Sequence, residues 1–158
     1  MMSFVHIVLA VLALTPQARA SATEPTVVFV CEHGAAKSVI ATAYFNKIAA
    51  ERGLRARAIY RGTNPQPDLS VRTIKGLQDD GLAVPEEKPS AITSADVEAA
   101  TVIFAIGCTL PANASASGKS ANWDDVPEDQ GYGAQRDAIK KHVESLIADL
   151  LSKQRANR

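Results

Sequence analysis

Residues 26–51, TVVFVCEHGAAKSVIATAYFNKIAAE, read as a strand, a short loop and a helix. Residues 26–30 are apolar or β-branched throughout, which predicts a buried strand. Residues 39–51 carry apolar side chains at helical spacing, and we expect Ser38 to cap this helix at its N-terminus. Residues 31–37 therefore form a loop that leads directly from a strand into a helix.

The rest of the chain repeats this alternation of strands and helices. Strands that are apolar along their whole length and alternate with helices indicate a parallel sheet covered on both faces. Right-handed crossovers then place all the strand-to-helix loops on one edge of the sheet. Cys31 and Cys108 each follow an apolar strand, so we expect both on that edge. The further strands are predicted at 56–61, 101–106 and 120–123, and the further helices at 70–80, from 94 onward with Ser94 as its cap, and at 134–153. Residues 111–119 are small and polar, so we expect a loop there.

Length and composition limit the classes of protein to consider. The chain has 158 residues, enough for one domain, which we place at residues 25–154. Its formal net charge is zero and aromatic residues make up 5%. Neither a positive field nor a base-stacking surface would then attract nucleic acid. His33 and His142 do not stand at a zinc-binding spacing from Cys108, and we predict no metal and no cofactor.

The first 20 residues resemble a secretion signal peptide. An apolar run at residues 4–14 is too short to span a bilayer comfortably, and Pro16 ends it. Ala18-Arg19-Ala20 then forms a small-x-small cleavage site. The alternative is a buried strand or helix at the start of the domain, because no Lys or Arg precedes the apolar run. Cleavage after Ala20 predicts a periplasmic or secreted protein with no membrane attachment.

The loop at residues 31–37 has the features of an anion-binding site. Successive backbone N–H groups can point inward, and the N-terminus of the following helix adds positive potential. Gly34, Ala35 and Ala36 have little or no side chain, so a ligand can approach the backbone closely.

Cys31 at the mouth of this loop would feel the same positive field. Such a field favours the thiolate over the thiol and makes the sulfur a nucleophile at neutral pH. Lys37 supplies the formal positive charge of the loop. Ser38 can donate its hydroxyl to the sulfur and ease its departure in a second step.

Cys31-x5-Lys37-Ser38 resembles the Cys-x5-Arg-Ser signature of low-molecular-weight phosphotyrosine phosphatases and of the arsenate reductases that share their fold. The loop is most similar to arsenate-reductase loops of the form Cys-x-His-Asn-Ala-Gly-Arg-Ser, with which Cys31, His33, Ala35 and Ser38 agree. The resemblance makes Cys31 the nucleophile. It assigns oxyanion binding to Glu32, His33, Gly34, Ala35, Ala36, Lys37 and Ser38.

The resemblance also implies a fold and covers most of the chain after the predicted signal. The family fold is a three-layer α/β structure, a four-stranded parallel sheet in the order 2-1-3-4 with helices on both faces. Its phosphate loop follows the first strand, as residues 31–37 do here.

Two positions depart from the family pattern. Lys37 stands in place of an arginine, and lysine is a point charge where arginine grips an oxyanion with two parallel hydrogen bonds. We expect slower chemistry or a differently shaped substrate. Gly34 stands where the family usually has an asparagine that braces the loop, so we expect a looser loop.

The family's general acid is an aspartate in an Asp-Pro turn of a distal loop. It protonates the leaving oxygen and later activates water. The corresponding segment here, residues 122–128, reads NWDDVPE and contains no Asp-Pro. We rank Asp125 first, Asp124 second and Glu128 third as the acid. The alternative is a solvated acidic loop.

Cys108 matches a second cysteine of arsenate reductases, which follows the equivalent strand in a Gly-Cys pair. By that resemblance Cys108 would attack Cys31 and form a disulfide after arsenic is reduced. The alternatives are a small buried residue or a permanent structural disulfide. The further cysteine of the thioredoxin-linked enzymes is absent from this chain.

The leading hypothesis is a cysteine-dependent, phosphatase-like enzyme that acts on a phosphate monoester or on arsenate through a Cys31 thiolate. The first alternative is a thiol-dependent arsenate reductase that uses Cys31 and Cys108 with a thiol reductant. The second alternative is an oxyanion-binding module whose turnover has weakened.

Overall fold

The computed structural model describes residues 24–157, and the predicted signal peptide lies outside them. A single four-stranded sheet forms the centre, in the order β2-β1-β3-β4, and all its neighbouring strands are parallel. This confirms the predicted fold class and strand order. The strands are β1 (Thr26–Cys31), β2 (Arg57–Gly62), β3 (Val102–Ile106) and β4 (Ser120–Trp123).

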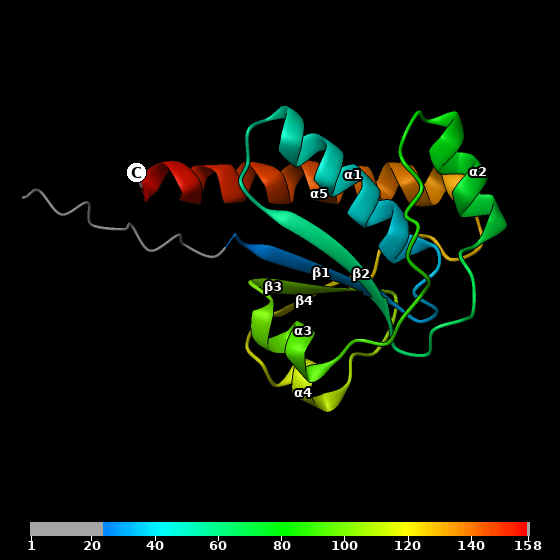
Figure 1. Cartoon of the computed structure of the whole chain (residues 1–158), viewed down its shortest axis with the longest axis horizontal. Helices are drawn as coiled ribbons and strands as arrows, with labels where there is room; N and C mark the ends of the chain where they lie inside the picture. The colour runs from blue at the N-terminus through cyan, green and yellow to red at the C-terminus, as the bar shows by residue number, and fades with distance from the viewer. Residues whose placement is uncertain (1–23, 158) are drawn as a thin grey trace, which may run out of the picture.

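Helices cover both faces of this sheet, as Figure 1 shows. One face is covered by α1 and α5, with α2 packed beside them, and the other face carries α3 and α4. The short α4 lies in a segment for which the sequence predicted only loop. The helices are α1 (Lys37–Glu51), α2 (Val71–Asp79), α3 (Ser94–Ala99), α4 (Ala112–Ser115) and α5 (Gly131–Ala156).

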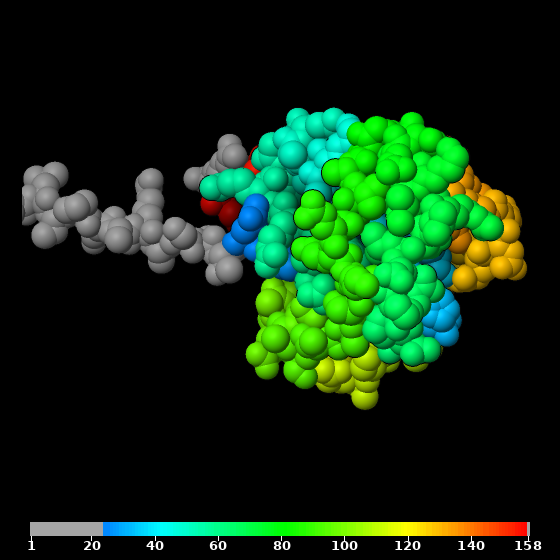
Figure 2. All heavy atoms as spheres, turned by 45° about the vertical axis from the view of Figure 1, so that its right-hand side comes forward, coloured from blue at the N-terminus to red at the C-terminus, as the bar shows by residue number. Residues whose placement is uncertain are grey.

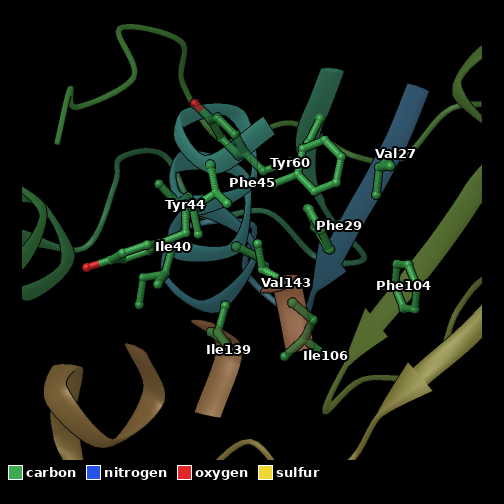
Figure 3. Close-up of a cluster of buried hydrophobic side chains, with 14 of the residues drawn as sticks. Val27, Phe29, Ile40, Tyr44, Phe45, Tyr60, Phe104, Ile106, Ile139 and Val143 are labelled. Carbon is green, nitrogen blue, oxygen red and sulfur yellow. The ribbon is translucent and has the colours of Figure 1, made fainter. Parts of the chain in front are cut away.

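The central strand β1 is apolar throughout because each of its faces is buried in a separate core. Phe29 enters the larger core, between the sheet and the helices α1 and α5, where Ile40 and Val143 meet it (Figure 3). Val28 and Val30 enter the smaller core beneath α3 and α4. Burial of side chains on both faces is what the uninterrupted apolar run predicts.

Two helix caps differ from the sequence prediction. Helix α1 begins at Lys37, its N-cap is Ala36, and no side chain caps it. The prediction that Ser38 caps α1 is therefore wrong. Thr93, not Ser94, caps α3, in a capping box with Asp96.

The fold brings four connecting segments together at one edge. Because all the strands are parallel, their carboxyl ends lie on the same side of the molecule, where α1 and α5 also begin (Figure 1). The segments that follow the strands start there, at residues 32, 63, 107 and 124. This is the edge at which open α/β sheets bind their ligands. No helix in the described part of the chain is long and apolar enough to cross a membrane.

Candidate active site

The two reactive side chains of the β1–α1 loop face each other. Cys31 Sγ and Ser38 Oγ lie 3.1 Å apart, and both residues are buried. Ser38 is thus turned toward the sulfur at the start of α1 instead of capping the helix. With Cys31 ionised, the hydroxyl is the donor and stabilises the thiolate.

The carbonyl groups of this loop are held by the segment that follows β2. Four of them accept a hydrogen bond from a backbone N–H of residues 63–70, so this acceptor side of the loop faces that segment. The four bonds run from Thr63 to Cys31 (3.1 Å), Asn64 to Glu32 (2.8 Å), Gln66 to His33 (3.2 Å) and Ser70 to Ala35 (3.0 Å).

The backbone N–H groups of the loop, unlike these carbonyl groups, have no partner among the described residues. Within residues 24–157, the backbone amides of residues 32–39 donate to no protein acceptor. The last of these belong to the first turn of α1, whose N–H groups have no partner inside the helix. A run of consecutive unpaired amides beside a helix N-terminus is suited to hold an anion.

Two glycines let the loop and its neighbouring segment touch. Gly34 has φ of +61°, and a Cβ there would lie 2.9 Å from the backbone nitrogen of Gly62. A Cβ on Gly62 would in turn lie 2.9 Å from the nitrogen of Gly34. The loop therefore packs directly against the backbone of Gly62 at this position.

Lys37 is buried and paired with a distant acid. Only 9% of its side chain is exposed, and its ammonium forms an ion pair with Glu128 from the segment that precedes α5. The ion pair lies against Gly107. A Cβ at that position would lie 2.7 Å from Lys37 Nζ and would also collide with the Glu128 carboxylate. The loop's cation is therefore already matched by an anion.

Cys108 lies next to the nucleophile's strand. Its Sγ donates to the carbonyl of Val30 at 3.4 Å, and the residue is partly exposed. Both Cys108 and Cys31 are free thiols, so the alternative of a permanent disulfide is wrong for this structure. Burial, and then the neighbouring charge of Cys31, raise the pKa of Cys108 to about 11.

The three acidic candidates for proton transfer lie in different surroundings. Asp125 accepts a hydrogen bond of 2.7 Å from His142 on α5, and this bond lowers the pKa of Asp125. Asp124 is exposed, and its carboxylate bonds to no side chain of residues 24–157. Glu128, ranked third, makes the contact with Lys37.

Two side chains of the loop are exposed to solvent. Glu32 and His33 are exposed, and His33 Nδ1 lies 3.3 Å from the carbonyl oxygen of Asn64. Figure 2 shows light-blue atoms of the loop at the surface, between the green segment after β2 and the orange start of α5. The loop is therefore open to a ligand from outside.

Other features of the described residues do not compete with this site. A groove of about 940 Å³ runs along β2 beside residues 81–90, but no residue of the phosphate loop lines it. Residues 24–157 contain no group of three or more side chains that could hold a metal ion. The unpaired amides, Cys31 and Ser38 thus form the reactive centre that the geometry supports best.

A family model matches this architecture. The model of the low molecular weight phosphotyrosine protein phosphatase aligns with residues 26–122, from β1 to β4. The chain belongs to the low molecular weight phosphotyrosine protein phosphatase family. No curated protein matches its sequence.

Solved structures agree with the family assignment at the level of the fold. YfkJ from Bacillus subtilis is 19% identical, with a TM-score of 0.72 over 84% of this chain and 98% of its own. A thioredoxin-dependent arsenate reductase from Corynebacterium glutamicum is 18% identical, with a TM-score of 0.64 over 82% and 62% of the two chains. An arsenate reductase from Archaeoglobus fulgidus is 24% identical, with a TM-score of 0.59 over 77% and 98%. The chain therefore shares its fold with YfkJ and with these two arsenate reductases.

Sequence reasoning missed two contacts of this phosphatase-family site. It did not foresee that Gly34 touches Gly62, although a glycine at each position was a signal of close backbone approach. It also did not foresee that Lys37 and Glu128 pair above Gly107. The sequence gives no periodicity that would reveal this pair, since its members lie 91 residues apart.

Proposed function

We propose that this chain is a phosphatase that hydrolyses phosphate monoesters through a Cys31 nucleophile. The observation that carries the proposal is the position of Cys31 Sγ, 3.1 Å from Ser38 Oγ, in a residue that directly precedes the unpaired amides of residues 32–39. A phosphoryl group held by those amides would stand in front of the sulfur. Family membership supports the same assignment.

The proposed reaction has two steps. The Cys31 thiolate attacks phosphorus, the S–P bond forms, and the bond between phosphorus and the ester oxygen breaks. Loop amides and Lys37 stabilise the charge on the equatorial oxygens. Water then attacks the cysteinyl phosphate and releases phosphate, and the hydroxyl of Ser38 stabilises the departing thiolate.

Protonation of the leaving oxygen is the step with the weakest support in this site. The Asp125 carboxylate accepts a hydrogen bond from His142, and the Glu128 carboxylate is paired with Lys37. We propose Asp124 as the acid, since no described side chain occupies its carboxylate. Such an exposed acid is weakly positioned, so we expect good turnover only for esters with good leaving groups, such as aryl phosphates.

The test is hydrolysis of para-nitrophenyl phosphate by the chain and by two cysteine variants. Cys31→Ser should lower kcat by about 1,000-fold or more, because the nucleophile is lost. Cys108→Ser should retain most of the activity. Equal turnover by Cys31→Ser and the parent chain would refute the proposal. Phosphate binding without turnover by any variant would select the weakened binding module instead.

One observation favours a second candidate, the arsenate reductase. Cys108 is a free, partly exposed thiol bonded to the carbonyl of Val30, next to Cys31. Cys31 would bind arsenate with loss of water, and Cys108 would then attack the sulfur of Cys31. A disulfide forms, arsenic leaves as arsenite with two electrons, and an external thiol reduces the disulfide.

The pKa of Cys108 makes this second reaction slow. At a pKa of about 11, roughly one Cys108 in 10,000 is a thiolate at neutral pH. Arsenite production from arsenate with added thiol measures the reaction. If arsenite appears and Cys108→Ser abolishes it while aryl phosphate is not hydrolysed, the reductase is the correct assignment.

A further inference from the structure

The two side chains of the Lys37–Glu128 ion pair differ strongly in solvent exposure. The Lys37 side chain is 9% exposed, whereas the Glu128 side chain is 61% exposed. A buried ammonium needs a partner, because an uncompensated buried charge is costly. Glu128 supplies that partner from the solvent side, at the open edge of the phosphate loop.

The backbone of Glu128 is fixed by its neighbours. Gln135 on α5 donates from Nε2 to the carbonyls of Pro127 and Glu128, each at 3.0 Å. Val126, two residues earlier, is buried in the main core. The carboxylate is therefore delivered to Lys37 by an anchored segment, which argues against a chance contact of a mobile side chain.

We propose that Glu128 is a positioning residue that sets which oxyanion charge the loop accepts. This inference rests on the proposed function. The Glu128 carboxylate offsets the single charge of Lys37, and the exposed Glu32 of the loop adds a further negative charge, so these carboxylates repel an anion that approaches the loop. A dianion entering the amides meets that repulsion twice as strongly as a monoanion of the same shape. Glu128 therefore biases the site toward oxyanions of lower charge.

The probes are sulfate and perchlorate, which are both tetrahedral and differ in charge. Binding is measured from shifts of the backbone amide signals of residues 32–39 in ¹H–¹⁵N spectra, at constant ionic strength because salt screens the effect. Glu128→Gln keeps the shape of the side chain and removes its charge. We expect it to tighten perchlorate binding about 3-fold and sulfate binding about 10-fold, since the free-energy gain scales with the charge of the anion.

Asp129→Asn is the matched control, since it changes net charge equally at a neighbouring exposed residue that makes no contact with Lys37. It should leave both affinities unchanged. Adding Lys37→Met to Glu128→Gln should remove the gain if the effect acts through Lys37. Melting curves of each variant without anion confirm that the fold is retained.

Three results would overturn the inference. In the first, Glu128→Gln increases the affinity for sulfate and for perchlorate by the same factor. In the second, it increases neither affinity. In the third, Asp129→Asn increases both affinities as much as Glu128→Gln does. Absence of any anion-dependent shift in the loop amides of every variant would refute the proposed function as well. If the parent chain binds the anions and Glu128→Gln binds them with the same affinity, only the inference about Glu128 is refuted.

Discussion

Two polar regions of this molecule differ in how their hydrogen bonds are used. At the end of α2, both carboxylate oxygens of Asp80 accept hydrogen bonds from other side chains. The hydroxyls of Tyr44 and Tyr132 both donate to Oδ2 at 2.7 Å, and Arg136 donates to Oδ1 at 3.1 Å. In the phosphate loop, by contrast, the amides of residues 32–39 have no protein acceptor within residues 24–157.

The hydrogen bonds around Asp80 stabilise the fold, whereas the unpaired amides of the loop form the proposed binding site. The Asp80 network joins α1, α2 and α5, and its carboxylate is satisfied without a ligand. Partial burial would raise the pKa of Asp80, but bonds from Tyr132 and Tyr44 and the charge of Arg136 outweigh it and lower that pKa. The loop amides have no acceptor in the described part of the chain, and under the proposed function an oxyanion would accept their hydrogen bonds.

The largest expected effect comes from filling the space between Gly34 and Gly62. Gly34→Ala would force a Cβ to within 2.9 Å of Gly62 N at a φ of +61°, so either the loop or its brace must move. We expect loss of most turnover, about 100-fold or more, because misplaced catalytic groups lose rate steeply. Steady-state kinetics with para-nitrophenyl phosphate measures it.

Gly53→Ala is the control for that change. Gly53 also has a positive φ, +68°, but a Cβ there would meet nothing within 4 Å. It should cost about 1 kcal/mol of stability from backbone strain and leave turnover unchanged. Equal loss of turnover in both variants would mean that the Gly34 contact has no special role.

The next effect tests the satisfied network. Asp80→Asn removes the charge that two tyrosines and Arg136 share, and we expect it to destabilise the fold by about 1–3 kcal/mol at pH 7. Turnover should remain, because the network does not touch the loop. Urea unfolding measures the loss.

The pH dependence of that loss follows from the sign of the shift. A lowered pKa in the folded state gives stability that is fully present above the unfolded pKa, about 3.9 for aspartate. This stability is lost as the pH falls toward the folded pKa. The difference between the parent chain and Asp80→Asn should therefore be constant near neutrality and shrink below about pH 4. A difference that grows on acidification would contradict this account of Asp80.

The smallest expected effect on turnover distinguishes Asp124 from Asp125 as the general acid. Asp124→Asn should slow hydrolysis of phenyl phosphate about 10-fold and of para-nitrophenyl phosphate less, since the better leaving group needs less protonation. Asp125→Asn should change neither rate appreciably, because His142 already occupies that carboxylate. A larger loss in Asp125→Asn than in Asp124→Asn would reverse the assignment.

The sequence was sufficient for the fold because the determining signals are local. Strands β1 and β3 are apolar on both faces, and the longer helices α1, α2 and α5 carry apolar residues at helical spacing. Cys31 and the loop could be located for the same reason, as a strand, a turn and a helix in succession. The four residues of α4, Ala-Asn-Ala-Ser, have no apolar stripe, and so the sequence predicted a loop there.

Contacts that join distant segments could not be predicted. Asp125 was ranked first as the acid from its place in the chain, but His142 on α5, stacked on Trp123 with ring centroids 4.8 Å apart, binds its carboxylate. Ser38 was expected to cap α1, but the helix starts at Lys37, two residues earlier than predicted, and the Ser38 hydroxyl faces Cys31. Each outcome depends on how the elements pack, which no local pattern encodes.

Alkylation of the two cysteines by iodoacetamide, followed by peptide mass spectrometry, tests the central claim most directly. Cys31, surrounded by unpaired amides, should react much faster than Cys108 near neutral pH, and inorganic phosphate should slow the reaction of Cys31 alone. If Cys31 reacts no faster than Cys108, or if phosphate gives it no protection, the loop does not activate this sulfur or hold an oxyanion in front of it.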